Sequence, residues 1–199
     1  MNKTRVSPAT MLYPLPAVMV TVGNIEESNI ITIAWTGIIN SKPPMTYISV
    51  KKSRYSHGIL LKNMEFVINL TSENLIKSMD FCGVKSGKEI DKFHETKLTK
   101  EDADKVRAPL IKESPINIEC KVFEVKELPS HDMFLAEIVA VHVNEELIDK
   151  SGKYWLEKAD LIAFNHGGYY RVNNKPLGRF GYSIMKKKTK KKLNKRNPK

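Results

Sequence analysis

Ser53 and Arg54 are residue types that bind phosphate, and their position in the chain suits that chemistry. They follow a segment that alternates like a strand and precede one that is typical of a helix. A helix N-terminus offers an anion unpaired N–H groups and a favourable dipole, arginine adds a permanently charged fork, and serine adds a hydroxyl. Taken alone, the pair is explained equally well as a helix cap beside a solvated arginine.

A second candidate for anion binding is the segment 81–93, which reads FCGVKSGKEIDKF. Its two glycines flank Ser86, and the second of them is Gly87. This pattern predicts a loop that can bring backbone N–H groups close to a ligand. Lys92 would add positive charge there, and Phe93 would add an apolar wall. An ordinary surface loop is the alternative explanation.

Two further features suit a flat heterocyclic ring. The small residues Thr32, Ala34 and Thr36 fall on one face of an alternating segment, where a ring could approach the backbone N–H and C=O groups. Asn69 interrupts the apolar run FVINL at 66–70, and a carboxamide can pair with a ring edge that has both donors and acceptors. The structural alternatives are a strand face covered by another element and an asparagine that satisfies a local turn.

Several familiar motifs are missing from the sequence. No two of the ten glycines stand two apart, so the dinucleotide fingerprint G-x-G-x-x-G is absent, and there is no G-x-S-x-G elbow. The nearest approach to a P-loop, at 83–88, is one residue short and continues with Glu89 instead of Ser or Thr. The five histidines show no metal-ligand spacing, so no metal site is predicted. Cys82 and Cys120 occupy apolar positions and are predicted to be buried structural thiols.

The positive charge of the chain is concentrated at its C-terminus. The formal net charge is +11, from 33 basic and 22 acidic residues, and residues 186–199 (KKKTKKKLNKRNPK) contain nine of the bases and no acid. The remaining body has a net charge of only +2. We therefore predict a domain over 1–185 and a disordered basic tail over 186–199. The tail would bind polyanions such as nucleic acid non-specifically, but the body contains no nucleic-acid recognition motif.

A chain of 199 residues predicts a single domain that needs no disulfide for stability. Two cysteines without a clear secretion signal favour a reducing, cytoplasmic setting. The apolar stretch 11–22 resembles a signal peptide, but Pro14 and Pro16 interrupt it and no small-residue cleavage site follows. No run approaches the roughly 18 apolar residues of a membrane span, so no membrane partner is expected.

Strand patterns dominate the body. They predict strands at 18–22, 29–39, 45–51, 66–70, 116–125 and 133–143, the last two joined by a turn at 129–132. Short helices are predicted at 54–63 and 73–82, the second capped by Ser72 and stopped at Gly83. These elements indicate a mainly β protein with a closed or partly closed barrel. The strand 133–143 is apolar on both faces, so it needs a second cover, such as a partner subunit.

The order of the motifs is more informative than any one of them. The series is N-x-x-T-x-A-W-T at 29–36, Pro43-Pro44, Ser53-Arg54, FVINL at 66–70, C-G-x-x-S-G at 82–87, D-K-F at 91–93 and Glu119-Cys120. Across roughly 10–175 the chain resembles the flavin reductase-like family, which includes flavoredoxins, ferric reductases and the reductase components of two-component monooxygenases. The resemblance implies an FMN-binding split β-barrel of Greek-key type. It also implies a homodimer with each FMN near the subunit interface.

The resemblance assigns roles to residues as well. It implies that the isoalloxazine lies against Thr32, Ala34, Trp35 and Thr36. It implies that the phosphate and ribityl chain are held by Ser53, Arg54, Ser86, Gly87 and Lys92, with Phe93 as the apolar wall. It implies that the pyrimidine edge or the ribityl chain meets Asn69, Leu70 and Thr71. On the nicotinamide side it implies His131 and one of Tyr169 and Tyr170.

The implied activity is hydride transfer from NADH or NADPH to N5 of FMN, followed by electron transfer to a flavin, a ferric complex or a protein. An FMN electron carrier without efficient NAD(P)H oxidation is the alternative within the family. Polyanion binding through the basic tail is the alternative from another class. A third alternative keeps the barrel but gives it haem, a deazaflavin or no cofactor.

Overall fold

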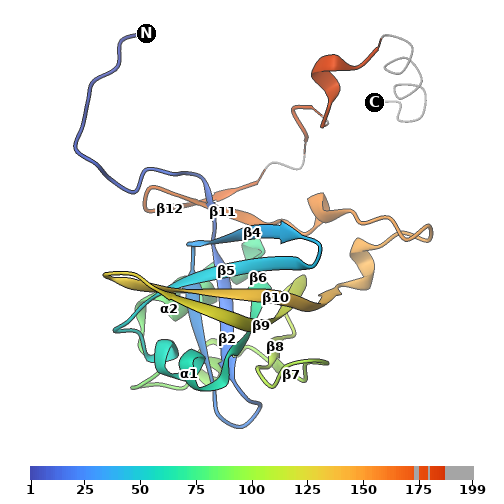
Figure 1. The fold of residues 1–199 in the computed structure, drawn as a ribbon. Coiled ribbons are helices and arrows are strands. Elements are labelled where there is room, and N and C mark those ends of the chain that lie inside the picture. Colours follow the sequence, from blue (N-terminus) through green and yellow to red (C-terminus); the bar gives the residue numbers. More distant parts are fainter. Residues whose placement is uncertain (173–174, 179, 187–199) are drawn as a thin grey trace.

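A computed structural model describes residues 1–172, 175–178 and 180–186, so the predicted tail lies outside the described residues except for Lys186. Seven strands form one antiparallel sheet in the order β3-β2-β6-β9-β10-β5-β4 (Figure 1). Their bounds are β2 Val18–Gly23, β3 Ser28–Ile33, β4 Thr36–Ser41, β5 Pro44–Lys51, β6 Glu65–Leu70, β9 Ile116–Glu127 and β10 His131–Val143. The prediction of a mainly β protein is confirmed.

The sheet curls around a single core. Alternate side chains of six strands meet there, among them Val20, Ile31, Ile48, Phe66 and Phe134. The helix α1 (Tyr55–Asn63) adds Leu60 to the same cluster. Period-two alternation therefore directs one face of each of these six strands inward, as in a barrel.

A second layer covers the outer side of β2 and β3. It consists of the 3₁₀ turn η1 (Glu73–Leu75) with the helices α2 (Ile76–Val84) and α3 (Lys92–Thr96). Met79 and Cys82 of α2 pack there against Met19 and Ile30. Gly83 permits the close approach, because a Cβ at this position would lie 3.1 Å from the Cβ of Thr32.

Smaller elements complete the chain. They are β1 (Leu15–Pro16), β11 (Ile162–Asn165) and β12 (Gly168–Arg171) in one sheet, β7 (Lys100–Glu101) and β8 (Leu110–Ile111) in another, and the 3₁₀ turns η2 (Glu145–Leu147), η3 (Leu156–Lys158) and η4 (Tyr182–Ile184). None of the helices in the described ranges is long and apolar enough to span a lipid bilayer.

The sequence predicted one strand over 29–39, but the structure has two. The chain leaves β3 after Ile33, turns at Ala34 and Trp35, and re-enters the sheet as β4 on its opposite edge. Period-two alternation continues through this turn, so the sequence pattern did not reveal the break. The predicted helix 73–82 is also modified: it starts as a 3₁₀ turn, ends at Val84, and makes no side-chain cap bond through Ser72.

The break leaves the barrel split between β3 and β5. Strand β3 pairs only with β2, and β4 pairs with β5 no further along than Ile48. The outer edge of β3 and the last residues of β5 therefore face each other without a hydrogen-bonded ladder. A single backbone bond pins one end of this opening, from Ser49 N–H to Trp35 O at 2.9 Å.

A buried hydrogen bond joins α1 to the start of β10. His57 Nε2 lies 2.7 Å from Asp132 Oδ2, and Lys52 Nζ lies 3.2 Å from Asp132 Oδ1. Burial alone would raise the pKa of Asp132, but the hydrogen bonds from His57 and Lys52 outweigh it and hold this pKa below its usual value. The ring of His57 also packs edge-on against Phe134.

We predict that Asp132→Asn destabilises the protein in a pH-dependent way. A lowered carboxyl pKa stabilises the fold above the unfolded value of about 4, and this contribution disappears as the pH falls through the folded pKa. Loss of the carboxylate charge that His57 and Lys52 contact costs roughly 1–3 kcal/mol of folding free energy near neutral pH. Thermal unfolding of both proteins between pH 7 and pH 3 checks this, with Asp102→Asn at an exposed position as the control. A difference in unfolding temperature between the wild type and Asp132→Asn that stays constant down to pH 3 would contradict the prediction.

Candidate functional site

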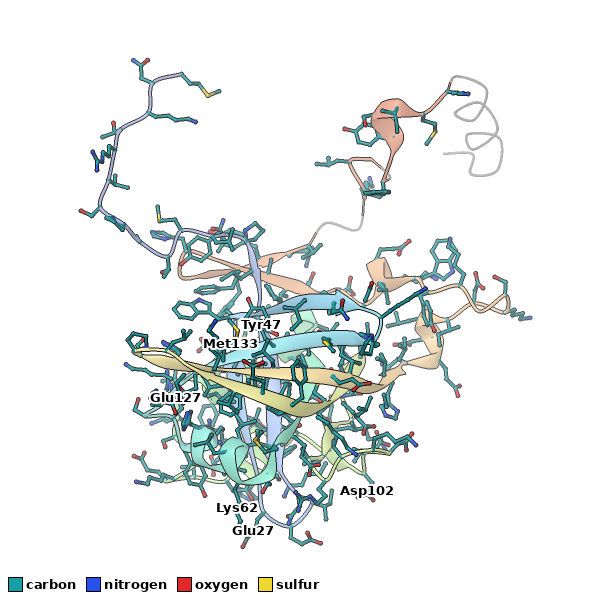
Figure 2. The ribbon with its side chains drawn as sticks, in the orientation of Figure 1. Glu27, Tyr47, Lys62, Asp102, Glu127 and Met133 are labelled. Carbon is teal, nitrogen blue, oxygen red and sulfur yellow. The ribbon has the colours of Figure 1, made fainter. Side chains whose placement is uncertain are left out.

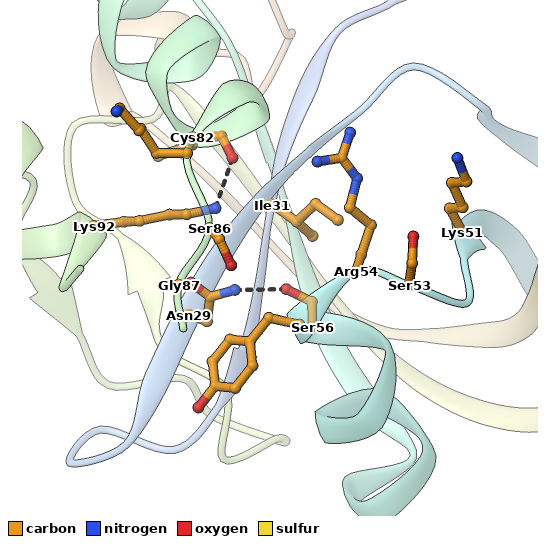
Figure 3. Close-up of a pocket in the computed structure, with 12 residues that line it drawn as sticks. Asn29, Ile31, Lys51, Ser53, Arg54, Ser56, Cys82, Ser86, Gly87 and Lys92 are labelled. Atoms are coloured by element: carbon orange, nitrogen blue, oxygen red, sulfur yellow. Dashed lines mark hydrogen bonds between the residues drawn. The ribbon is translucent and has the colours of Figure 1, made fainter. Parts of the chain in front are cut away.

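A pocket of about 380 Å³ lies beside the split of the barrel (Figure 3). Its lining comes from β3, the end of β5, the start of α1, the end of α2 and the loop that leads to α3. The lining residues are Asn29, Ile31, Lys51, Ser53, Arg54, Tyr55, Ser56, Cys82, Lys85, Ser86, Gly87 and Lys92. Four of these are cationic and none is acidic, so the pocket suits an anion.

Lys92 is the buried cation of this pocket. Only 4% of the residue is exposed, and its Nζ donates to the backbone oxygens of Ile30 and Cys82, each at 2.7 Å. Burial lowers the pKa of the Lys92 ammonium, and the charge of Arg54 lowers it further. An ammonium group has three donors, so one remains after these two bonds. No carboxylate in the described structure forms an ion pair with it.

The start of α1 forms the facing wall. Arg54 is the N-cap residue, and the first helical turn contains no acidic residue. In this first turn His57 N–H donates to Arg54 O at 2.9 Å, which leaves the N–H groups of Tyr55 and Ser56 to add donors and positive potential to the pocket. Asn29 Nδ2 donates to Ser56 Oγ at 2.7 Å and ties β3 to this helix across the pocket floor (Figure 3).

Gly87 is required where the loop 85–88 meets β3. A Cβ at this position would lie 2.1 Å from Oδ1 of Asn29, so any larger residue would displace the asparagine. Beside it, the Ser86 hydroxyl accepts a hydrogen bond from Lys88 N–H at 3.3 Å. The loop therefore lies close to β3 and keeps Ser86 at the pocket.

The pocket continues along the split into a narrower space of about 210 Å³. Both spaces are lined by Ile31, Lys51 and Arg54, and the second is also lined by the chain turn that ends β3. At its far end the rings of Trp35 and His131 stack in a tilted contact, with centroids 4.8 Å apart. One groove thus joins a cationic end to an aromatic end.

A third cavity, of about 240 Å³, lies on the other side of the β3 end. It shares Thr32 and Ala34 with the groove and is closed by Tyr169 and Asp80. The Tyr169 hydroxyl donates to Asp80 Oδ1 at 2.7 Å, and burial together with this bond raises the pKa of Tyr169 to about 12.

The structure brings most of the predicted site residues to this groove. Those that line it or the adjoining cavity are Thr32, Ala34, Trp35, Ser53, Arg54, Ser86, Gly87, Lys92, His131 and Tyr169. Of the two tyrosines considered, Tyr170 is exposed and lines none of these spaces.

Five predicted residues lie elsewhere: Thr36, Asn69, Leu70, Thr71 and Phe93. The hydroxyl of Thr36 donates to Tyr47 O at 2.5 Å on the neighbouring strand. Leu70 packs against two apolar clusters, Thr71 is buried, and Phe93 belongs to the core between β3 and α2.

Asn69 is fully buried and has its hydrogen-bonding groups occupied within the protein. Its Nδ2 donates to Met19 O at 3.0 Å, and its Oδ1 accepts from Ile111 N–H at 3.0 Å and from Asn117 Nδ2 at 2.7 Å. The carboxamide therefore joins β2, β6 and β9, and it presents no free atom to a ligand.

Four polar lining residues were not among the predicted site residues: Asn29, Lys51, Ser56 and Lys85. Asn29 opens the motif at 29–36, and Lys51 and Ser56 flank Ser53-Arg54, so proximity in sequence was an available signal. The cysteines are free and buried as predicted, and burial raises the pKa of Cys82 to about 11.

The structure also brings together three groups that could ligate a metal, Asp104, Glu119 and His142. The Glu119 carboxylate is already bonded to the backbone N–H groups of residues 104–106, at 2.6 to 3.0 Å, and to His142 Nε2 at 2.6 Å. These bonds therefore anchor the loop at residues 104–106 to Glu119 of β9.

The chain is similar to known proteins over most of its length. The model of the family described as "Flavin reductase like domain" matches residues 10–172. An uncharacterized protein of Archaeoglobus fulgidus is 31% identical over 163 residues, which cover 82% of this chain and 90% of the relative.

Two solved structures are similar over almost their whole length. The flavoredoxin of Desulfovibrio vulgaris (Miyazaki F) is 29% identical, with a TM-score of 0.84 over 92% of this chain and 100% of that one. The flavoredoxin from Methanosarcina acetivorans is 26% identical, with a TM-score of 0.83 over 93% and 100%. The predicted split-barrel fold is confirmed by this likeness.

We predict that Arg54→Ala weakens FMN binding at least about tenfold. The substitution removes a charged donor worth roughly 1.5 kcal/mol or more from the anion pocket, and tenfold in affinity corresponds to about 1.4 kcal/mol. Flavin fluorescence titration measures the change. Lys62→Ala is the matched control, because Lys62 is an exposed cation of the same helix that does not line the pocket. Equal losses in the two variants would show that only overall charge matters.

Proposed function

The chain belongs to the flavin reductase-like family, an FMN-binding family, and on this premise we propose that it is an NAD(P)H-dependent FMN oxidoreductase. The proposed donor is NADH or NADPH, bound transiently, and the proposed acceptor is a small molecule or a protein. The two buried free thiols suit the reducing environment of the cytoplasm, which is the proposed location.

The observation that supports this function best is the groove with one acid-free cationic end and one aromatic end. A buried ammonium without a carboxylate partner is costly, and a bound phosphate would remove that cost. The residues present fit FMN in this respect. Arg54, Lys92, Ser53 and the first turn of α1 would hold the phosphate, and the end of β3 would face the ring.

FMN would supply the redox chemistry when bound, as an acceptor of hydride from NAD(P)H and a donor of electrons to the second substrate. The chain contributes binding and orientation. The unpaired edge of β3 offers backbone donors and acceptors to the ring edge, and the nearby cations Lys51 and Arg54 favour negative charge on it. No nucleophile is required, in keeping with the raised pKa of the Cys82 thiol.

We predict that the purified protein, after FMN is added and the excess removed, retains the two visible flavin absorption bands. NADH or NADPH should bleach them without oxygen, because the open groove gives the nicotinamide access to the ring. Absorption spectra and stopped-flow reduction by each nucleotide measure both steps. A colourless protein would contradict FMN binding.

A second candidate function is that of an FMN electron carrier reduced by a protein donor. The similarity to two flavoredoxins favours it. The same experiment separates the two candidates, since a carrier would keep its flavin bands but would be bleached only slowly by either nucleotide.

We also propose a homodimer, supported by the two-sided apolar character of β10. Phe134 faces the core and is fully buried, whereas Leu135 points the opposite way beside Tyr47 of β5 and stays partly exposed. Phe123 of β9 and Val141 of β10 are more than half exposed. Among the described residues, the buried positions of β10 are Asp132, Phe134 and Ala136, which share one face, and the opposite face has none.

We predict that Leu135→Arg shifts the protein from dimer to monomer, because a charge at the centre of an apolar interface loses its hydration on association. Sedimentation equilibrium of the FMN-loaded protein measures the shift. Leu61→Arg adds the same charge at an exposed position on α1 and should leave the dimer intact. A wild-type protein that is monomeric at high concentration would refute the proposed dimer.

A further inference from the structure

A cavity larger than the anion pocket lies beyond the aromatic end of the groove. Its volume is about 640 Å³, within the usual range for small-molecule sites of roughly 300–1,000 Å³. Trp35, Ser49 and His131 line both this cavity and the groove, so the two spaces adjoin at these residues. This cavity is distinct from the anion pocket, because none of the predicted phosphate-site residues lines it.

The lining of this cavity is largely apolar and has no lysine, arginine or carboxylate; its polar side chains are those of Thr10, Tyr47, Ser49, Ser130 and His131. Tyr47 and Met133 form its floor on β5 and β10 (Figure 2), on the outward face that also carries Leu135, so the cavity borders the proposed subunit interface. Leu128 and Trp35 add further apolar surface. The contrast with the anion pocket is sharp, because that pocket has four cationic residues and this cavity has no lysine or arginine at all.

The outer wall is the N-terminal segment of the chain. Residues 9–12 line the cavity although they belong to no helix or strand, and Met11 and Leu12 are largely exposed. When an apolar ligand fills the open mouth of a cavity, the apolar side chains there are removed from water, and this burial favours binding. The aromatic and thioether surfaces of Trp35, Tyr47 and Met133 favour a flat ring in particular.

From these features we infer that the cavity binds the electron acceptor, and that this acceptor is an uncharged, apolar ring compound of the quinone class. The inference rests on the proposed function. The absence of basic side chains disfavours a phosphorylated flavin, a dinucleotide or an anionic ferric chelate here. The net reaction is NAD(P)H + H⁺ + quinone → NAD(P)⁺ + hydroquinone: the nicotinamide loses two electrons as hydride, and the quinone gains two electrons and two protons.

The test uses menadione, an uncharged 1,4-naphthoquinone, with the FMN-loaded protein. Leu12→Asp places a carboxylate in the wall of the cavity at a residue that is 81% exposed, so the barrel is not disturbed. Val6→Asp is the matched control, because Val6 is 68% exposed in the same segment and does not line the cavity. Equilibrium dialysis measures menadione binding, and steady-state rates compare menadione with the hydrophilic anion ferricyanide.

Leu12→Asp should weaken menadione binding at least fivefold and lower the ratio of menadione to ferricyanide rates by a similar factor, whereas Val6→Asp should change neither by more than twofold. Absence of menadione binding to the wild-type protein, or equal effects of the two variants, would overturn the inference. A dimer weakened by Leu12→Asp in a protein that binds no menadione would identify the cavity as part of a subunit interface. Dialysis remains informative if NAD(P)H fails to reduce the flavin, so failure of the proposed function can be told apart from failure of this site.

Discussion

The missing hydrogen-bonded ladder between β3 and β5 is the constraint on which the rest of the structure depends. The chain leaves the sheet at Ala34 and Trp35 and crosses to the opposite edge, so two strand edges face each other unpaired. Buried backbone groups need partners, and an unpaired edge is therefore either solvated, covered or bonded to a ligand. Lys92 satisfies one such group, the carbonyl of Ile30, and the remainder of the edge lines the groove.

Charge is distributed along this groove in a gradient. The end beside α1 has four cationic side chains and no acid, the middle is lined by the end of β3 together with Lys51 and Arg54, and the far end is aromatic and has no lysine or arginine. A molecule with a phosphate at one end and a flat ring at the other matches the first two regions. The net charge of the whole chain has no part in this match, since it arises from the tail, whereas the positive potential of the groove arises from a few fixed residues.

Much of this arrangement could be predicted from residue types, but not all. Ser53, Arg54, Ser86 and Gly87 were identifiable because helix N-termini and glycine loops have local signatures. The break at Ala34 had no such signature, since alternation continues through it. Asn69 was predicted at the ring edge or the ribityl chain, whereas its carboxamide joins three strands in the structure. The two arrangements have the same sequence pattern, and only the positions of Met19, Ile111 and Asn117 distinguish them.

The central claim is that the cationic end of the groove holds the phosphate of a flavin. Comparison of the dissociation constants of FMN and riboflavin tests it most directly, since the two ligands differ only in that phosphate. Even one charged hydrogen bond of about 1.5–3 kcal/mol predicts that FMN binds at least about tenfold more tightly, with a preference that shrinks as salt concentration rises. Equal affinities, or a preference insensitive to salt, would contradict the assignment of Arg54 and Lys92 to the phosphate.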